Sequence, residues 1–369
     1  MNETECAAAV KRHARALGFD LVGITTAQPP QHAKEFQDWL AKRFHGEMAY
    51  MARNAPKRIE PLRILSDARS IVVVGMNYHL EAVVPSGDSA RSAAGTAATT
   101  PRNRIARYAW GDGDYHEVMG ERLKQLSDFI RSLPVSGTQA HNCSHTEAIW
   151  YVDTGPILER DLAQRAGVGF IGKHTNLISR RFGNWIFLGA VLTNLQLALD
   201  PPEREYCGTC RRCIDACPTR AIVAPYQLDA RLCISYLTIE LKGAIPVDLR
   251  SVIGDRIFGC DDCLEVCPWN RFARESPVKE FQRRELPPLT EFLSWDKAKF
   301  KAFFRGTPIY RIKRRGFLRN VCVALGNIGD KSAVPPLQRA LDDPEPLVRE
   351  HAAWAIEQIR SRMDRKRNQ

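Results

Sequence analysis

The sequence lacks a hydrophobic run long enough to cross a membrane. Its longest apolar stretch, residues 185–199, is interrupted by Thr193, Asn194 and Gln196. A membrane-spanning helix needs about 20 consecutive apolar residues, so we expect no transmembrane segment.

The first residues also lack the features of an export signal. They combine acidic side chains with amphipathic spacing, and they contain neither an apolar core nor a twin-arginine pair. We therefore expect a cytoplasmic protein. Because that compartment keeps thiols reduced, we do not interpret the 11 cysteines as disulfides.

The chain has no shortage of apolar residues, which excludes a wholly disordered protein. With 369 residues, of which 44% are hydrophobic, it is long enough for two or three domains with a buried core. The formal net charge of +11 is concentrated at one end, since residues 271–369 carry 22 basic and 12 acidic side chains, a net of +10. This excess indicates either a polyanionic partner such as RNA or DNA, or a solvated basic surface.

The cysteines are unevenly distributed. Cys6, Cys143 and Cys322 are scattered, whereas the other eight lie between positions 207 and 267. Residues 207–218 read CGTCRRCIDACP, which is the C-x2-C-x2-C-x3-C-P run of bacterial ferredoxins. In such a run three thiolates bind one [4Fe–4S] cluster and the fourth binds a second cluster.

A second run, CDDCLEVCP at residues 260–268, has the same ending but lacks one upstream cysteine, for which Cys233 is the candidate. The crossover rule then predicts two complete [4Fe–4S] clusters. The ligands of cluster 1 would be Cys207, Cys210, Cys213 and Cys267, and those of cluster 2 would be Cys217, Cys233, Cys260 and Cys263.

Zinc is the alternative occupant, because paired C-x2-C elements also form zinc ribbons. A zinc ribbon does not require the full ferredoxin run, so the spacing favours iron–sulfur clusters. A ferredoxin needs only about 60 residues, and another part of the chain must therefore receive the electrons.

The spacing of apolar residues predicts an α/β (α+β) domain upstream of the cysteines, a ferredoxin-like domain and a helical tail. We place these domains at residues 1–198, 199–275 and 276–369. Residues 84–104 are small and polar without periodicity, which indicates a surface loop. Helices are expected at 3–17, 32–44, 114–132, 156–166, 318–328, 333–341 and 347–359, and strands at 70–78, 148–153 and 184–193.

The tail resembles a HEAT-type helical repeat in its phrase DPEPLVREHAAWAI. One and a half repeats are too few to stand alone, so we expect the tail to dock on the preceding part of the chain. A basic stripe on such helices suits the RNA backbone. The candidate RNA-binding residues in it are Arg311, Lys313, Arg314, Arg315 and Arg319.

Three segments together resemble the epoxyqueuosine reductases, the family that completes queuosine synthesis on tRNA. They are VDTGPILERDLAQRAGVGFIGKHTNLI at 152–178, CGTCRRCIDACPT at 207–219 and GCDDCLEVCPWN at 259–270. The resemblance implies a cobalamin in the N-terminal domain beside two [4Fe–4S] clusters, in an arrangement similar to reductive dehalogenases. Electrons would pass through the clusters to cobalt, and the epoxide oxygen of the wobble base would leave as water.

The family's proton donor is the aspartate of the VDTGP motif, here Asp153. It would have to be buried against the corrinoid to carry a proton at neutral pH. From the residues alone, the alternative is that Asp153 caps a helix that begins near Pro156.

The resemblance also implies a set of cobalamin contacts, for each of which packing or loop polarity is the alternative. Some relatives place a cysteine near the cobalt where this chain has Ala106, so no thiol acts there. The implied cobalamin-binding residues are Arg58, Ala106, Asp153, Lys173, Leu177, Leu188, Ser235, Asp261 and Asp262.

Two other functions remain as alternatives. A reductive dehalogenase-like enzyme for small halogenated molecules would usually carry an export signal and no basic tail. A non-catalytic iron–sulfur electron carrier would bind no corrinoid and would leave the 200-residue upstream domain without a purpose. For the favoured reaction we expect tRNA carrying epoxyqueuosine as substrate, a flavodoxin or ferredoxin system as electron donor, and a monomeric protein.

Overall fold

The structure is a computed structural model that describes residues 1–81, 104–134 and 145–367. Most of the loop expected at 84–104 and Cys143 lie outside the described residues. The chain divides into two compact units made of discontinuous segments. Unit 1 comprises residues 1–79, 113–233 and 261–281, and unit 2 comprises 80–112, 234–260 and 282–369. This division differs from three consecutive domains, whose boundaries stay a prediction.

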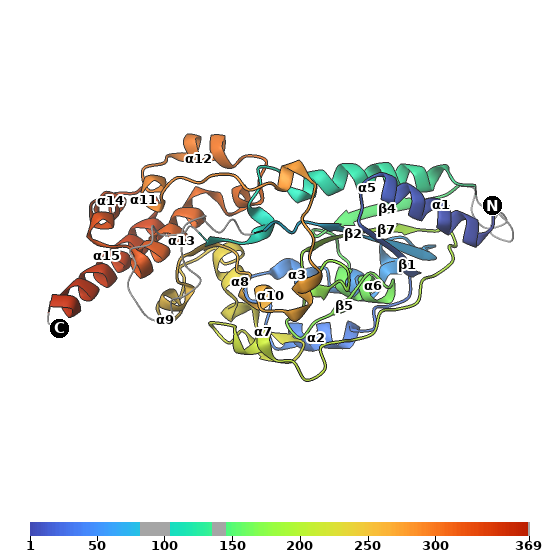
Figure 1. Ribbon diagram of the computed structural model, residues 1–369, viewed down its shortest axis with the longest axis horizontal. Coiled ribbons are helices and arrows are strands. Elements are labelled where there is room, and N and C mark those ends of the chain that lie inside the picture. The colour runs from blue at the N-terminus through green and yellow to red at the C-terminus, as the bar shows by residue number, and fades with distance from the viewer. Residues whose placement is uncertain (82–103, 135–144, 368–369) are drawn as a thin grey trace. The chain divides into compact units, whose positions relative to one another are not determined.

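Unit 1 is built around a four-stranded sheet with the order β1-β2-β7-β4 (Figure 1). All three strand pairs are antiparallel, so the unit is α+β in arrangement. Its strands are β1 (Leu21–Thr26), β2 (Ser70–Asn77), β4 (Ala148–Val152), β5 (Phe170–Ile171), β6 (Leu177–Ile178), β7 (Ile186–Thr193), β8 (Ile222–Ala224) and β9 (Gln227–Leu228). Its α-helices are α1 (Glu3–Ala16), α2 (Ala33–Ala41), α3 (Ala49–Arg53), α4 (Ala55–Ile59), α5 (Tyr115–Ser132), α6 (Glu159–Arg165), α7 (Arg212–Asp215) and α10 (Asp262–Glu265).

Both faces of this sheet are buried, which explains the continuous β-branched run in β2. Alternate side chains of a strand point to opposite faces. Ile71 and Val73 join the core formed with α6, while Val72 and Val74 are fully buried without belonging to it. Helices α1 and α5 pack together, and Gly189 of β7 lies so close to Leu123 of α5 that an added Cβ would come within 2.7 Å. The strands expected at 70–78, 148–153 and 184–193 are thus confirmed to within two residues.

Unit 2 is mainly helical. Its elements are β3 (Arg104–Ile105), α8 (Ile234–Ile239), α9 (Val247–Arg250), β10 (Arg256–Phe258), α11 (Leu289–Phe292), α12 (Lys297–Phe304), α13 (Lys313–Ile328), α14 (Val334–Ala340) and α15 (Pro346–Arg367). Strands β3 and β10 pair in parallel. The core is rich in aromatic rings, with Phe292, Trp295, Phe304 and Phe317 almost fully buried.

The helical tail packs on earlier parts of the chain within this unit, as its short length predicted. Helix α13 lies against α15 and α14 lies against α15, like the paired helices of a HEAT repeat. Helix α13 also packs against β10. Asn320, which is fully buried in α13, donates hydrogen bonds to the carbonyl oxygens of Thr238 (2.8 Å) and Ile257 (2.9 Å).

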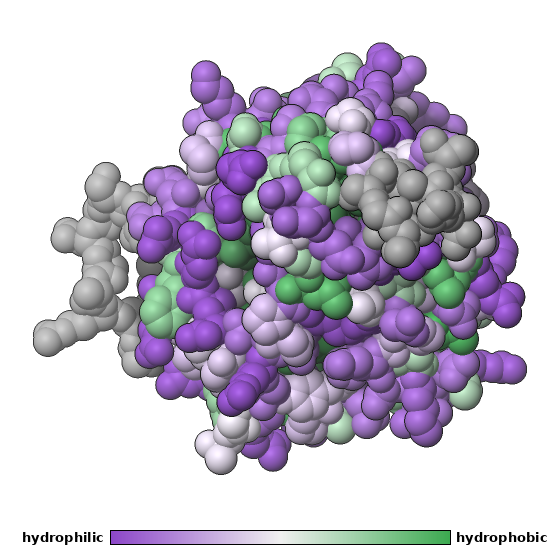
Figure 2. All heavy atoms as spheres, turned by 90° about the vertical axis from the view of Figure 1, so that its right-hand side faces the viewer, coloured by the Kyte–Doolittle hydropathy of each residue, from purple (hydrophilic) through white to green (hydrophobic). Residues whose placement is uncertain are grey.

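The helices in the described part of the chain are all too short or too polar to cross a bilayer. On the face drawn in Figure 2, hydrophilic side chains predominate and hydrophobic groups form only small patches.

Candidate functional site

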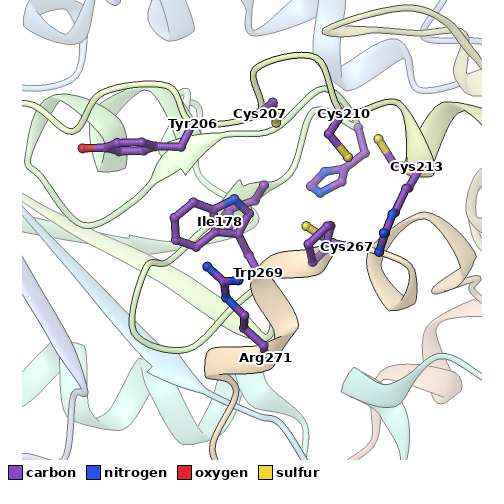
Figure 3. A pocket seen from close by; sticks show the side chains of 11 residues that line it. Ile178, Tyr206, Cys207, Cys210, Cys213, Cys267, Trp269 and Arg271 are labelled. Atoms are coloured by element: carbon purple, nitrogen blue, oxygen red, sulfur yellow. The ribbon is translucent and has the colours of Figure 1, made fainter.

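Four cysteine side chains of unit 1 line one cavity of about 180 Å³ (Figure 3). Cys207 and Cys210 come from the loop that leads into α7, Cys213 lies in α7, and Cys267 follows α10. These are the four residues that the crossover rule assigns to cluster 1. The sulfurs surround a space and do not meet at a point. Among the described residues no three His, Cys, Asp or Glu side chains converge on a single metal ion.

The protein environment alone does not favour thiolates in this cavity. Burial raises the pKa of Cys207 to about 11 and also raises the pKa of Cys213. A cysteine binds metal only as the thiolate, so a bound cationic centre would have to displace these protons. With raised pKa values, these thiols are poorly suited to act as free nucleophiles.

Lys173 anchors the loop that carries these cysteines. Its ammonium donates to the carbonyl oxygens of Gly208 (2.5 Å) and Cys210 (3.0 Å). Gly208 has a φ of +49°, a left-handed conformation that glycine adopts without strain. The structure thus places Lys173, expected at the cobalamin, on the backbone of the cluster 1 loop.

The other four cysteines are distributed over both units. Cys217, Cys233 and Cys263 belong to unit 1, whereas Cys260 is the last residue of a unit 2 segment. Cys263 lies in α10, which packs on α7. The backbone NH of Ala221 lies 3.2 Å from the sulfur of Cys217, as is common for metal-binding thiolates.

Asp153 lies directly after β4 and has a φ of +54°, which is unusual for any residue but glycine. Its Oδ2 accepts a hydrogen bond from the Tyr115 hydroxyl at 2.7 Å and lies 3.2 Å from Nε2 of His116. The surrounding protein partly desolvates the carboxylate, which raises the pKa of Asp153, but the hydrogen bonds from His116 and Tyr115 outweigh this effect, so the pKa is lower than usual.

The side chain of Asp153 is 63% exposed, which differs from the expected burial. Helix α6 begins only at Glu159, and no side chain caps it. The structure therefore excludes the alternative in which Asp153 caps this helix.

His116 lies between two carboxylates. Its Nδ1 is 2.7 Å from Oδ1 of Asp114, and its Nε2 faces Asp153. Asp114 is itself held by capping α5 through the backbone NH of His116, and the Tyr115 ring stacks on Phe187 at 4.2 Å. Because each ring nitrogen faces a carboxylate oxygen, the imidazole connects Asp114 to Asp153 through two short polar contacts.

Arg58 is buried in α4, and its Nη1 donates to the carbonyl oxygen of Ile157 at 2.6 Å. It therefore braces the segment that follows Asp153. Within the described residues, Nε of Arg58 and Oε1 of Glu159 are buried without a hydrogen-bond partner. Burial and the charge of Asp153 raise the pKa of Glu159 to about 8. Sequence reasoning missed Glu159, Tyr115 and His116 as members of this site.

The remaining candidates for cobalamin contact do not form one described site. Leu177 is buried in the unit 1 core and Leu188 packs against the same core. Asp261 and Asp262 stand at the start of α10, the first buried and the second half-buried. Ala106 is buried in unit 2, where its NH donates to Phe258 at 2.8 Å, and the hydroxyl of Ser235 is 3.5 Å from the carbonyl oxygen of Cys260.

Two of the five basic residues proposed for tRNA binding are buried, which corrects that expectation for them. Arg314 donates to the carbonyl oxygen of Trp295 (2.6 Å) and pairs with Asp343. Arg319 is 1% exposed, and its guanidinium donates hydrogen bonds to the carbonyl oxygens of residues 237, 241 and 243 at 2.7–2.8 Å. The exposed members of the set are Arg311, Lys313 and Arg315.

Family models match three parts of the chain. Residues 58–154 match the model described as Epoxyqueuosine reductase QueG, DUF1730. Residues 206–270 match a 4Fe-4S double cluster binding domain, which agrees with the two clusters expected from the spacing. Residues 316–366 match HEAT repeats.

Relatives cover nearly the whole chain. The epoxyqueuosine reductase of Xanthomonas campestris is 40% identical over 359 residues, covering 96% of both chains. That of Escherichia coli K12 is 40% identical, covering 95% of this chain and 88% of its own.

Solved structures of epoxyqueuosine reductases have the same fold. One, crystallised with an epoxyqueuosine-modified tRNA-Tyr stem loop, has a TM-score of 0.83 and 30% identity, covering 97% of this chain and 91% of that one. The Bacillus subtilis enzyme, described with its catalytic aspartate loop swung out of the active site, has a TM-score of 0.80, 30% identity and the same coverage. The chain therefore belongs to the epoxyqueuosine reductase family and is an oxidoreductase.

Proposed function

We propose that this protein reduces epoxyqueuosine to queuosine at the wobble position of tRNA. The reaction takes two electrons and two protons, breaks the two carbon–oxygen bonds of the epoxide, and yields an alkene and water. One observation carries the proposal beyond the likeness to relatives. Asp153 of the VDTGP segment contacts the titratable side chains of Tyr115 and His116, in the same unit as the four-thiol cavity.

The cysteines are proposed as ligands in the pairing expected from the sequence. Cys207, Cys210, Cys213 and Cys267 would hold cluster 1, and Cys217, Cys233, Cys260 and Cys263 would hold cluster 2. The shared cavity of the first four supports the first set. For the second set the support is the ferredoxin spacing and the family model that spans it.

A cobalamin fits the polar groups that unit 1 leaves without partners. The unpaired Nε of buried Arg58 is a donor for the amide or phosphate groups of such a cofactor. The exposed carboxylate of Asp153 can face a substrate on it. When bound, cobalamin supplies the low-potential reducing chemistry that protein side chains lack.

The residues of the chain would handle the proton. His116 and Asp114 hold it, Tyr115 fixes the carboxylate of Asp153, and Asp153 passes it to the leaving oxygen of the epoxide. Arg58 braces the loop through Ile157 while this happens. An alkoxide leaves poorly, so ring opening depends on this acid.

The partners follow from the same reaction. The exposed Lys313 and Arg315 are suited to contact tRNA phosphates, and a tRNA substrate implies a cytoplasmic protein. The electrons would come from a one-electron carrier such as a flavodoxin or a ferredoxin. We propose a monomer as the active form.

An anaerobic assay tests the function. The protein is reconstituted with iron, sulfide and cobalamin, reduced, and mixed with tRNA carrying epoxyqueuosine, after which the nucleosides are digested and weighed. We expect the modified base to lose one oxygen only when cobalamin is present. An unchanged base from protein fully loaded with iron and cobalt would contradict the proposal.

A further inference from the structure

The wall of the four-thiol cavity is formed in part by aromatic and basic side chains (Figure 3). Tyr206 and Trp269 have ring centroids 5.8 Å apart, and Trp269 lies 5.6 Å from Phe272. Tyr206 is 39% exposed and Phe272 is 38% exposed. Large apolar rings at the surface are typical of binding interfaces, where they supply contact area.

Arginines surround these rings. The guanidinium of Arg180 lies 5.0 Å from the Tyr206 ring centre, and that of Arg271 lies 4.6 Å from the Phe272 ring centre. Arg212 lines the same cavity and is exposed. We call these six residues the cavity rim: Arg180, Tyr206, Arg212, Trp269, Arg271 and Phe272.

The acidic side chains nearby do not neutralise the rim. Glu203 is 3.7 Å from Arg180, and Glu205 accepts a hydrogen bond from the backbone NH of Cys207. Arg212 and Arg271, in contrast, form no ion pair with any described residue. The rim therefore keeps positive charge directly beside the cysteines.

The proposed reaction needs two electrons from outside the chain, and an iron–sulfur cluster accepts them one at a time. A donor must come close to a cluster, and it binds fastest where its surface charge is opposite to that of the protein. We propose that the cavity rim is the docking surface for an acidic one-electron carrier protein that reduces cluster 1. This inference rests on the proposed function only in assuming that electrons enter through the clusters.

The test measures cluster reduction without tRNA, so its outcome does not depend on the fate of epoxyqueuosine. Reconstituted holoenzyme is mixed anaerobically with fully reduced flavodoxin, an acidic carrier, and the loss of cluster absorbance is followed in a stopped-flow instrument. The test variant combines Arg212→Glu with Arg271→Glu. The matched control combines Arg12→Glu with Lys124→Glu, which reverses two charges at exposed positions of α1 and α5 in the same unit.

We expect the test variant to be reduced by flavodoxin about tenfold more slowly at low salt, with the difference shrinking as salt increases. Reduction by dithionite, iron content and tRNA affinity should stay unchanged, and the control variant should behave like the wild type. If the charge reversals disturb folding, the milder pair Arg212→Ala and Arg271→Ala should give the same trend with a smaller effect.

Three results would overturn the inference. The first is that the test variant is reduced by flavodoxin as fast as the wild type at low salt. The second is that its reduction by dithionite slows as much as its reduction by flavodoxin, which would mean that the substitutions changed the cluster itself. A fall in tRNA affinity with a normal flavodoxin rate would assign the rim to the substrate.

Discussion

Asp153 can donate a proton only if its neighbours supply one, because its own pKa is lowered by the hydrogen bonds that hold it. His116 lies between Asp114 and Asp153 within hydrogen-bond distance of both, so its imidazole is the neighbour that can pass a proton to Asp153. We infer that the acid of the reaction is this set of side chains, with Asp153 as the member that faces the substrate.

The substitution Asp153→Asn should therefore abolish most turnover while leaving the cofactors bound. Asparagine keeps the size and the hydrogen bond from Tyr115 but cannot pass a proton on, so we expect kcat to fall by about 100-fold or more. Asp128→Asn, at an exposed position of α5, is the matched control. Full activity in the Asp153→Asn protein would show that another group is the acid.

Glu159 predicts a pH effect on stability. Its pKa is raised to about 8 in the folded protein, mainly by burial. As the pH rises from about 4.5 to 8, the unfolded chain ionises this group while the folded chain keeps it protonated, so folding loses free energy over that window. Glu159→Gln should raise the Tm at pH 8 by about 3 °C relative to wild type, and should change little at pH 4.

Calorimetry at the two pH values checks this expectation. An equal shift at both values would mean that the substitution acts through packing and not through ionisation.

At the residue scale, a sequence motif revealed Asp153 but not its partners. Tyr115 and His116 are 38 and 37 positions away from it in the chain. They meet Asp153 because α5 packs on β4, which no local pattern encodes. The lowered pKa of Asp153 depends on the same contacts, so the sequence could not predict it either.

At the scale of elements, the conformation of the loop that carries Cys207 and Cys210 depends on Lys173, which comes from another part of unit 1. Lys173→Met would remove both hydrogen bonds to the loop carbonyls. We expect reconstitution to fall from about eight iron atoms per chain towards four, as cluster 1 is lost. Iron and sulfide analysis beside a Lys124→Met control measures this, and a full iron load would show that the loop holds its shape alone.

Helix α13 combines two arginines with opposite roles. Arg319→Ala would remove the donor to the carbonyl oxygens of residues 237, 241 and 243, the first of them buried, and we expect a loss of about 3 kcal/mol in the free energy of unfolding. Arg315→Ala, at an exposed position, should change stability by less than about 0.5 kcal/mol. It should instead weaken tRNA binding and reduce the salt slope by about one.

Denaturant unfolding and salt-dependent tRNA binding distinguish these two variants. A loss of stability in both variants would contradict these roles of the two arginines. So would weaker tRNA binding by the Arg319→Ala protein without a loss of stability.

The same helix shows why element-level prediction was incomplete. The spacing of apolar residues predicts a helix in this part of the chain, and the row of arginines in it suggests an exposed basic stripe. Arg314 and Arg319 are buried because unit 2 surrounds this helix with β10, α8, α11 and α15, so that nearly all its faces are covered. Similarly, α6 begins at Glu159, three residues later than expected.

For the whole molecule, cysteine spacing carried the most information, because metal-binding loops impose short and recognisable separations. The sequence order could not reveal how distant segments join. Residues 80–112 and 234–260 belong to the unit that contains the tail, and Cys260 and Cys263 fall in different units although only three positions separate them. Three consecutive domains were the simplest expectation, and contacts between distant segments determine the actual units.

The central claim is that electrons stored in the cysteine-bound clusters remove the oxygen of epoxyqueuosine. The most direct measurement reduces the cobalamin-loaded enzyme anaerobically, removes the excess reductant, and adds tRNA with or without epoxyqueuosine. We expect the clusters to reoxidise only with the modified tRNA, with one queuosine formed for every two electrons lost. Clusters that stay reduced in its presence, or queuosine formed without reoxidation, would contradict the account.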